Sequence, residues 1–308
     1  MANETTKKTS SISSEKTKDL IFYCVMFALP VIQFCIFYIG VNFNSILLAF
    51  KSYSRVDGSY TFVGFENFTS AFKFITESSI FITSIKNSLI KYGLHLIISV
   101  PLALIFSYYI FKKMPGATVF RIILFTPSVI ASIVMVIIFN YFVDRALPVY
   151  MQNLFGIEIA GLLSNNETSL ATVFSYSIWI GFGVSVLMYT STMCSIDDSI
   201  VESAELDGAN NIREFFSIVL PLVWPTLTTF LVVSVAQICV DQNNVFSFYG
   251  ARADEKYYNI GYYLYVEAQG SEAGYPQLAA MGLMLTLVIV PITFVVKFLL
   301  EKLGPSAD

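Results

Sequence analysis

The stretch IFYCVMFALPVIQFCIFYIGVNF, residues Ile21–Phe43, decides the class of fold. It contains no charged residue, and it is longer than the about 20 apolar residues that a helix needs to cross a hydrocarbon core of ~30 Å. A cleaved signal peptide would end in a small-residue cleavage site, and no such site follows this run. We therefore interpret the run as a retained membrane span.

Five further apolar runs are long enough to cross a bilayer as helices. They are Tyr92–Phe111, Ile122–Phe142, Leu170–Thr190, Thr226–Phe248 and Leu278–Val296. The composition agrees, because charged residues make up only 13% of the chain, against roughly 25% in an ordinary soluble domain. The short alternating strands of a membrane β-barrel are not seen. The sequence predicts an all-α, polytopic membrane protein with six transmembrane helices.

Both ends of the chain are expected on the cytoplasmic side. Residues 1–19 are rich in Ser, Thr and Lys and predict a disordered tail. The six-helix membrane domain should cover 20–303, and 304–308 should form a short C-terminal tail. With cytoplasmic termini, the cytoplasmic segments hold ten Lys and Arg residues and the outer segments seven. This bias favours the cytoplasmic placement.

Several kinds of function are disfavoured by what the sequence lacks. A net charge of -4 argues against a nucleic-acid-binding face. No Gly is followed by Lys, so the chain has no GxxxxGK phosphate loop. We expect a protein that is not an enzyme, with no catalytic residue, no metal site and no bound cofactor. The single histidine, His95, lies four residues after Lys91. The sequence leaves two roles open for this pair, a helix–helix contact or contact with a solute or proton.

The loop between the fourth and fifth runs, within 193–225, is the most ordered part outside the membrane. It reads DDSIVESAELDGANNIREFFSIVLPLVWP from Asp197 to Pro225. The pattern predicts a helix over Ser199–Leu206 with an aspartate cap, a turn at Asp207-Gly208, and a second helix over Asn211–Leu220. Prolines should then restart the chain toward the fifth run.

A short helix that projects from a membrane domain can insert into a groove of another protein. The alternative is an amphipathic helix that lies on the lipid surface. The loop holds four acids but only one base in its central part, so attraction to anionic headgroups would be poor. A protein partner is therefore favoured.

ESAELDGANNIREFFSIVLP, residues 202–221, resembles the EAA loop of ABC importer permeases. That pattern is E-A-A, three residues, G, nine residues, and I-x-L-P, and here Ser203 replaces the usual second Ala. The form with DGA is similar to the carbohydrate importer branch, which includes maltose, glycerol-phosphate and multiple-sugar permeases. FVGFENF (62–68) and MPGATVFR (114–121) look like other loops of that branch. One departure is SFYGARADEK (247–256), where the family often has Gly-Gly-Pro.

The resemblance implies the permease subunit of an ATP-driven importer in a bacterial-type cytoplasmic membrane. It would move a sugar, more an oligosaccharide than a monosaccharide, across the lipid bilayer into the cytoplasm. It implies a second similar permease, two ATPase subunits that hold ATP and Mg, and an extracytoplasmic sugar-binding protein. The EAA-type segment would be a cytoplasmic coupling helix that contacts the ATPase. The expected coupling residues are Glu202, Ser203, Ala204, Asp207, Gly208, Ala209, Phe216, Leu220 and Pro221.

A translocation path is expected along the fifth run. Ser234, Gln237, Asp241 and Asn244 are spaced by three, four and three residues, which places them on one face of a helix. Polar groups at this depth should face protein or a wet cavity. Amides and carboxylates suit sugar hydroxyls, although hydrogen bonds to a partner permease are the alternative. The expected substrate-path residues are Tyr141, Tyr176, Trp179, Gln237, Asp241 and Asn244, the aromatic ones as platforms for sugar rings.

A self-sufficient secondary transporter or channel is the rival interpretation. It would work without an ATPase, with an acid such as Asp241 coupling an ion. An inverted internal repeat would favour it, and the sequence has no clear repeat.

Overall fold

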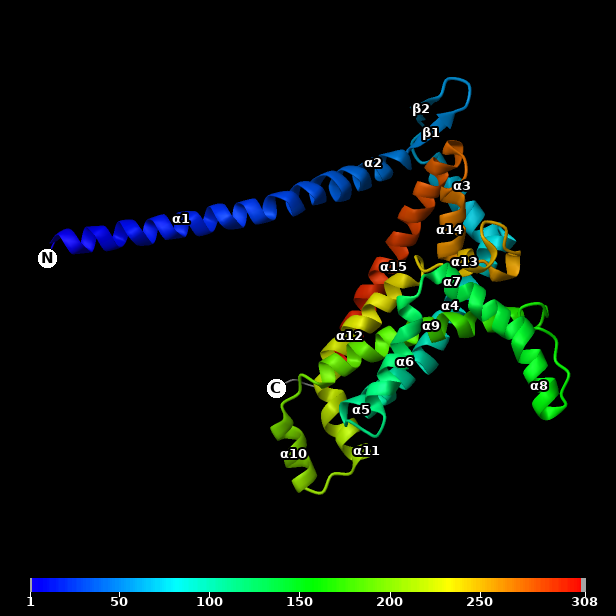
Figure 1. Ribbon diagram of the computed structural model, residues 1–308. Coiled ribbons are helices and arrows are strands. Elements are labelled where there is room, and N and C mark those ends of the chain that lie inside the picture. The colour runs from blue at the N-terminus through cyan, green and yellow to red at the C-terminus, as the bar shows by residue number, and fades with distance from the viewer. Residues whose placement is uncertain (1, 306–308) are drawn as a thin grey trace. The chain divides into compact units, whose positions relative to one another are not determined.

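A computed structural model describes residues 2–305, with side chains described from residue 17 onward (Figure 1). In this part of the chain, six helices are long and apolar enough to cross a membrane. They are Thr17–Leu48, Ser79–Phe111, Ser132–Phe155, Ser169–Met193, Asn211–Gln237 and Glu272–Leu303. The predicted all-α polytopic fold with six transmembrane helices is confirmed. The chain divides into two compact units, one of residues 1–70 with 272–283 and one of residues 71–271 with 284–308.

The first unit begins with a long helix and contains a small hairpin. Its elements are α1 (Ala2–Gln33), the π-helical turn η1 (Phe34–Gly40), α2 (Val41–Leu48), β1 (Lys51–Ser54), β2 (Ser59–Phe62), and the 3-10 turn η6 (Glu272–Gly274). The two strands pair antiparallel, with Lys51 opposite Phe62. Gly58, at φ +61°, closes the turn between them, and the side chain of Asn67 donates to the Lys51 carbonyl at 2.6 Å. The sequence analysis did not anticipate this hairpin.

Helix α1 differs from the disordered tail expected over residues 1–19. The backbone is helical from Ala2 onward and continues without interruption into the first span. No Gly or Pro occurs between Ala2 and Asp19, and extending an existing helix adds one hydrogen bond per residue without a new nucleation cost. The tail expected over 304–308 follows the end of the last helix at Leu303, and its residues 306–308 lie outside the described part.

The second unit holds most of the helices. Its elements are α4 (Ser79–Leu94), η2 (His95–Ser99), α5 (Val100–Phe111), α6 (Ala117–Val129), α7 (Ser132–Tyr141), η3 (Phe142–Ala146), α8 (Leu147–Phe155), α9 (Ser169–Met193), α10 (Asp198–Leu206), α11 (Asn211–Glu214), η4 (Phe215–Val219), α12 (Leu220–Gln237), α13 (Val245–Tyr249), η5 (Glu255–Tyr257) and α14 (Ile260–Ala268). Helix α3 (Glu66–Glu77) begins in the first unit and ends in the second, and α15 (Tyr275–Leu303) does the same.

Helix α9 is central to the second unit, where it packs on α5, α6 and α12 (Figure 1). The approach to α6 is close because position 183 is a glycine. A Cβ built there would lie 2.7 Å from the carbonyl carbon of Leu124. On the α5 side, the hydroxyl of Ser107 donates to the Val186 carbonyl at 2.9 Å. Small and hydroxylated residues are how membrane helices achieve close packing.

The third predicted span, Ile122–Phe142, is wrong as a single helix. Helix α6 ends at Val129, Ile130 and Ala131 have extended ψ angles of 142° and 132°, and α7 begins at Ser132. Pro127 removes one backbone donor just before the break. The hydroxyls of the flanking Thr126 and Ser128 bond back to carbonyls of the preceding turn, at 2.7 Å each. Such back-bonding weakens and bends a helix.

The fifth predicted span, Thr226–Phe248, is wrong at its outer end. Helix α12 stops at Gln237, and α13 starts only at Val245. Between them, the Asp241 carboxylate accepts the backbone N–H of Asn243 at 2.8 Å, and Asn243 has φ +53°. Asp and Asn form such local bonds in competition with a helix, and Asn tolerates positive φ. The polar stripe therefore leaves the helix after Gln237.

Candidate functional site

A cavity of about 320 Å³ lies among the helices of the second unit. Its wall is built by the second span, α9, α12 and the segment that follows α12. The polar residues that line it are Ser88, Lys91, His95, Ser99, Ser177, Ser185, Ser234, Gln237, Asp241 and Asn243. The aromatic residues that line it are Tyr92, Tyr189 and Phe230. Hydroxyls, two amides, an imidazole and two charges thus converge on one space.

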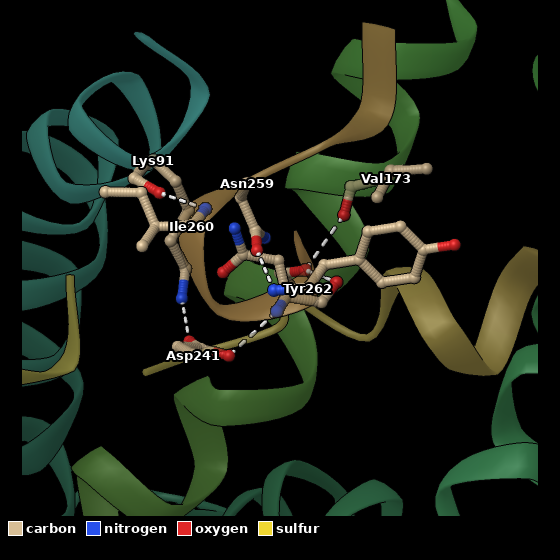
Figure 2. A network of polar contacts seen from close by, with 9 residues as sticks. Lys91, Val173, Asp241, Asn259, Ile260 and Tyr262 are labelled. Carbon is tan, nitrogen blue, oxygen red and sulfur yellow. Dashed lines mark hydrogen bonds and ion pairs between the residues drawn. The ribbon is translucent and has the colours of Figure 1, made fainter. Parts of the chain in front are cut away.

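The two charges in this cavity neutralise each other. The Lys91 ammonium points at the Asp241 carboxylate and forms an ion pair with it (Figure 2). Asp241 is held further, since it also accepts the N–H of Asn243, whose carbonyl accepts the Ser177 hydroxyl at 2.8 Å. Removing one partner would leave a partly buried charge uncompensated, which is far more costly than breaking an exposed pair.

The segment that carries Asp241 is confined by the start of α14. A Cβ at Gly261 would lie 2.6 Å from the Asp241 carbonyl oxygen, so only glycine allows this approach. The helix start is itself fixed, because Asn259 caps it by accepting the N–H of Tyr262 at 2.7 Å, and the N–H of Ile260 donates to Ser88 on α4 at 3.1 Å (Figure 2). The cavity wall at this point is a preorganised backbone arrangement.

The structure brings together some of the predicted path residues and separates others. Gln237 and Asp241 line the cavity. Asn244 does not line it and instead accepts a hydrogen bond from Ser132 at 3.1 Å. The expected stacking platforms also lie elsewhere: Tyr176 is fully buried in a cluster with Met135, Val136 and Phe139, and neither Trp179 nor Tyr141 is part of the cavity wall.

The cavity residues that sequence reasoning did not assign to the path come mostly from the second span and α9. The second span begins at Ser79, well before the predicted start at Tyr92, so Lys91 and His95 both lie inside it. Their spacing of four residues was the sequence feature that could have indicated a shared helix face in the cavity. Tyr92, Tyr189 and Phe230 carried no signal, because aromatic residues are frequent throughout the membrane segments.

Helix α10 has a defined beginning and end. Asp197 caps it by accepting the Ser199 N–H at 2.9 Å, and hydrogen bonds from the side chain and backbone of Ser199 lower the pKa of Asp197. At the other end, Gly208 has φ +78°, its N–H reaches the Glu205 carbonyl, and the Ala209 N–H reaches that of Ala204, both at 3.0 Å. These two bonds are those of a Schellman motif. The predicted cap and glycine turn are confirmed.

The second predicted helix of this loop is part of a longer one. Asn210 caps it by accepting the N–H of Arg213 at 2.8 Å, and the helix then runs unbroken over Asn211–Gln237. The expected restart at Pro221 and Pro225 is wrong. The π-helical turn η4 lies directly before Leu220 and Pro221, and its wider turn accommodates a residue that cannot donate to the ladder.

The predicted coupling residues share this segment but differ in exposure. Ala204 is buried, and Ala209, Leu220 and Pro221 are half-buried. The exposed ones are Glu202, Ser203, Asp207, Gly208 and Phe216. The segment therefore exposes acidic and small side chains on α10 and an aromatic ring on η4.

Lys112, directly after α5, holds the two halves of this loop together. Its ammonium bonds to Glu205 at 2.7 Å and to Glu214 at 3.1 Å, and Glu214 also accepts the Tyr108 hydroxyl at 3.1 Å. Burial by itself would lower the pKa of Lys112, but the hydrogen bonds to Glu205 and Glu214 outweigh it and raise that pKa. These contacts could not be predicted, because nothing in the sequence links positions so far apart.

Metal binding has no support in the residues that the structure describes, since no group of three or more His, Cys, Asp or Glu residues is placed to hold an ion.

Sequence and fold comparisons agree on one kind of protein. The chain is 23% identical over 267 residues to the multiple sugar-binding transport system permease protein MsmF of Streptococcus mutans, covering 85% of this chain and 90% of that protein. It is 24% identical over 289 residues to the arabinooligosaccharides transport system permease protein AraP of Bacillus subtilis, covering 88% of this chain and 86% of that protein.

Among solved structures, the fold resembles a chain of a bacterial ABC transporter involved in the import of the acidic polysaccharide alginate. The TM-score is 0.75 at 20% identity, with 96% of this chain and 99% of that chain covered. The model of the family "Binding-protein-dependent transport system inner membrane component" matches residues 96–308. These residues include the cavity wall from Ser99 to Asn243 and the whole of the α10 segment. The chain belongs to the family of binding-protein-dependent transport system inner membrane components.

Proposed function

We propose that this membrane transport component, which is not an enzyme, is the permease subunit of an ATP-driven importer that carries an oligosaccharide into the cytoplasm. The carrying observation is α10, a short acidic helix with both ends closed by hydrogen bonds and most of its side chains exposed. A connection between two spans has no need of such a structure. A rigid projecting helix is instead suited to insertion into a groove of a partner protein.

The partner for α10 is an ATPase subunit that holds ATP and Mg itself. The helix offers the carboxylate of Glu202 and the small side chain of Ser203, and Gly208 sets the direction of the chain after it. Large apolar side chains stand out around it: Leu206 is 89% exposed, Ile212 70% and Phe216 62%. Leu206 lies outside the membrane spans and Ile212 and Phe216 at the beginning of the fifth, and such exposed apolar side chains at the end of a span suit a protein contact. Two ATPase subunits and a second, similar permease complete the transporter.

The solute is a sugar that passes through the cavity described above. Gln237, Asp241 and Ser234 offer hydrogen bonds to hydroxyl groups, and Tyr92 and Phe230 offer faces on which a sugar ring can stack. MsmF and AraP carry sugar and arabinooligosaccharide transport in their names, which favours an oligosaccharide. An extracytoplasmic binding protein delivers it, in keeping with a family defined by binding-protein dependence.

The orientation follows from the ATPase partner. If α10 meets a cytoplasmic ATPase, an even number of spans places both termini in the cytoplasm of a bacterial-type cell, with residues 20–303 as the membrane domain. A self-sufficient secondary transporter or channel, the rival interpretation, would use Asp241 as an ion-coupling acid. Asp241 is instead neutralised by Lys91.

Co-purification tests the proposal. The tagged chain is isolated together with the products of neighbouring transporter genes, and Glu202→Lys and Gly208→Pro are compared with a matched charge reversal at the exposed Glu167, on a loop far along the chain from α10. We expect the ATPase with the native chain and with Glu167→Lys, and its loss from the two α10 variants. Sugar uptake by a preparation that never contains an ATPase would refute the proposal.

A further inference from the structure

Two lysines, one in the second span and one directly after it, pair with two acids near the two ends of the fifth span. Lys91 pairs with Asp241, which follows α12, and Lys112 pairs with Glu214, which ends α11. The lysines are separated by 21 positions, and the continuous helical run that carries Lys91 ends at Phe111, directly before Lys112; this corresponds to about 31 Å of helix. This is about the thickness of the hydrocarbon core. The two spans are therefore joined by two ion pairs that lie about one hydrocarbon thickness apart along the helix.

The pair at the α10 end is a permanent link. Glu214 is fully buried, and each of its carboxylate oxygens has a partner, one the Tyr108 hydroxyl and the other the Lys112 ammonium. The Lys112 side chain is only 14% exposed. Separating this pair would leave a buried carboxylate without its counter-charge, which is strongly unfavourable.

Packing reinforces this link. The rings of Tyr108 and Phe215 meet edge to face with centroids 5.1 Å apart. Leu104 of α5 and Val219 and Val223 of the fifth span belong to the same buried cluster. At this end of the unit, the second and fifth spans are held together by charge, by a hydrogen bond and by apolar contact.

The link to α10 is of a different kind. Glu205 reaches Lys112 at 2.7 Å, but its side chain is 57% exposed, and exposed pairs are individually weak. The same ammonium thus has a permanent partner on the fifth span and an exposed partner on α10.

We propose that Lys112 is the positioning residue that transmits the movement of α10 to the second and fifth spans. The inference rests on the proposed function, because it needs an ATPase that moves α10. Since the second span carries Lys91 and ends directly before Lys112, that movement reaches the Lys91–Asp241 pair in the cavity wall. Transport is then coupled to ATP hydrolysis through one ammonium group rather than only through the backbone of the loop.

The experiment uses the complete transporter in proteoliposomes, with both permeases, the ATPase and the binding protein. Lys112→Met removes the charge, and Lys113→Met is the matched control, because Lys113 is adjacent, exposed and without an ion pair in the described part of the chain. Lys112→Arg restores the charge. The double variant Lys112→Met/Glu214→Gln removes the buried carboxylate as well, so that a folding defect of the single variant does not block the test. ATPase content, ATP hydrolysis and sugar uptake are measured on the same vesicles.

We expect Lys112→Met and the double variant to retain the ATPase and to hydrolyse ATP, while sugar moved per ATP falls about tenfold, within the range usual for coupling between two sites. Lys112→Arg should recover most of the ratio, and Lys113→Met should match the native protein. An unchanged ratio in the double variant overturns the inference. Loss of the ATPase from it also does, because Lys112 would then only shape the docking surface. A native chain that never binds an ATPase fails the proposed function instead, before any variant is compared.

Discussion

Replacing Gly261 with alanine tests whether the segment that carries Asp241 is held by close backbone contact. A Cβ at this position would come 2.6 Å from the Asp241 carbonyl oxygen and closer still to that of Val240. Real Cβ contacts stay above 3.0 Å, and the nearest atom, the Val240 carbonyl oxygen, would lie at 2.4 Å, so the segment must retreat by about 0.6 Å. The atoms in the way belong to backbone and cannot rotate aside as the end of a side chain can.

The size of the effect follows from two opposing contributions. Overpacking a tight site costs ~1–3 kcal/mol, and backbone neighbours place this case in the upper part of that range. Alanine in a helix gains roughly 0.5–1 kcal/mol over glycine. The net expectation for Gly261→Ala is a loss of ~1–2 kcal/mol of stability. Gly93→Ala is the control, because no atom lies within 4 Å of its Cβ position, and it should gain about 0.5–1 kcal/mol.

Thermal unfolding of the purified transporter in detergent distinguishes the two variants. Gly261→Ala should unfold several degrees below the native protein, and Gly93→Ala at or above it. Sugar uptake should fall with Gly261→Ala, because the retreat moves Asp241 away from Lys91. If both variants unfold at the same temperature, the close approach at Gly261 does not confine the segment and the reasoning is refuted.

Three further predictions follow from the structure. Gly183→Ala should loosen the contact of α9 with α6 and lower the unfolding temperature, whereas Gly181→Ala, with open space at its Cβ position, should not. The lowered pKa of Asp197 means that its cap on α10 is fully present above the ordinary value of 3.8 and is lost as pH falls through the lowered value. Amide exchange over the first turn of α10 should therefore accelerate in acid, and Asp197→Asn, which also caps, should remove that dependence. In single-cysteine variants, the exposed Cys194 should react quickly with an impermeant maleimide, and only in inside-out vesicles if α10 is cytoplasmic. Cys239, whose pKa is raised by burial, should react slowly from either side.

The parts of the fold that are encoded locally could be predicted. Apolar length identifies a span because a helix must satisfy its own backbone in lipid. The glycine turn after α10 was also predictable, since Gly208 adopts φ +78°, which other residues rarely do. The hairpin at β1 and β2 was missed, although Asp57-Gly58 is a turn dipeptide between two short strand-like segments. Its signal is weak because each strand has only four residues.

Features that depend on distant partners could not be predicted. Lys112 and Glu214 are separated by 102 positions, and neither has a spacing that indicates the other. The polar stripe of the fifth span had the correct period for a helix, and Gln237 and Asp241 do line the cavity. The helix nevertheless ends between them, because Asp241 bonds to the N–H of Asn243 and to Lys91. A periodicity argument assumes a continuous helix and cannot detect where a side chain terminates it.

Three prolines of the chain explain why α-helices are preceded by π-helical turns at three places, one of them in the cavity wall. Pro101, Pro148 and Pro221 each occupy the second position of an α-helix that follows a π-helical turn. A proline cannot donate to the carbonyl four residues before it, and its ring clashes with that carbonyl. In each case that residue is the middle one of the π-helical turn, where the wider ring moves the carbonyl away. The turn before Pro101 runs from His95 to Ser99, and both residues line the cavity, so the same adjustment that fits a proline into the second span lies within the cavity wall.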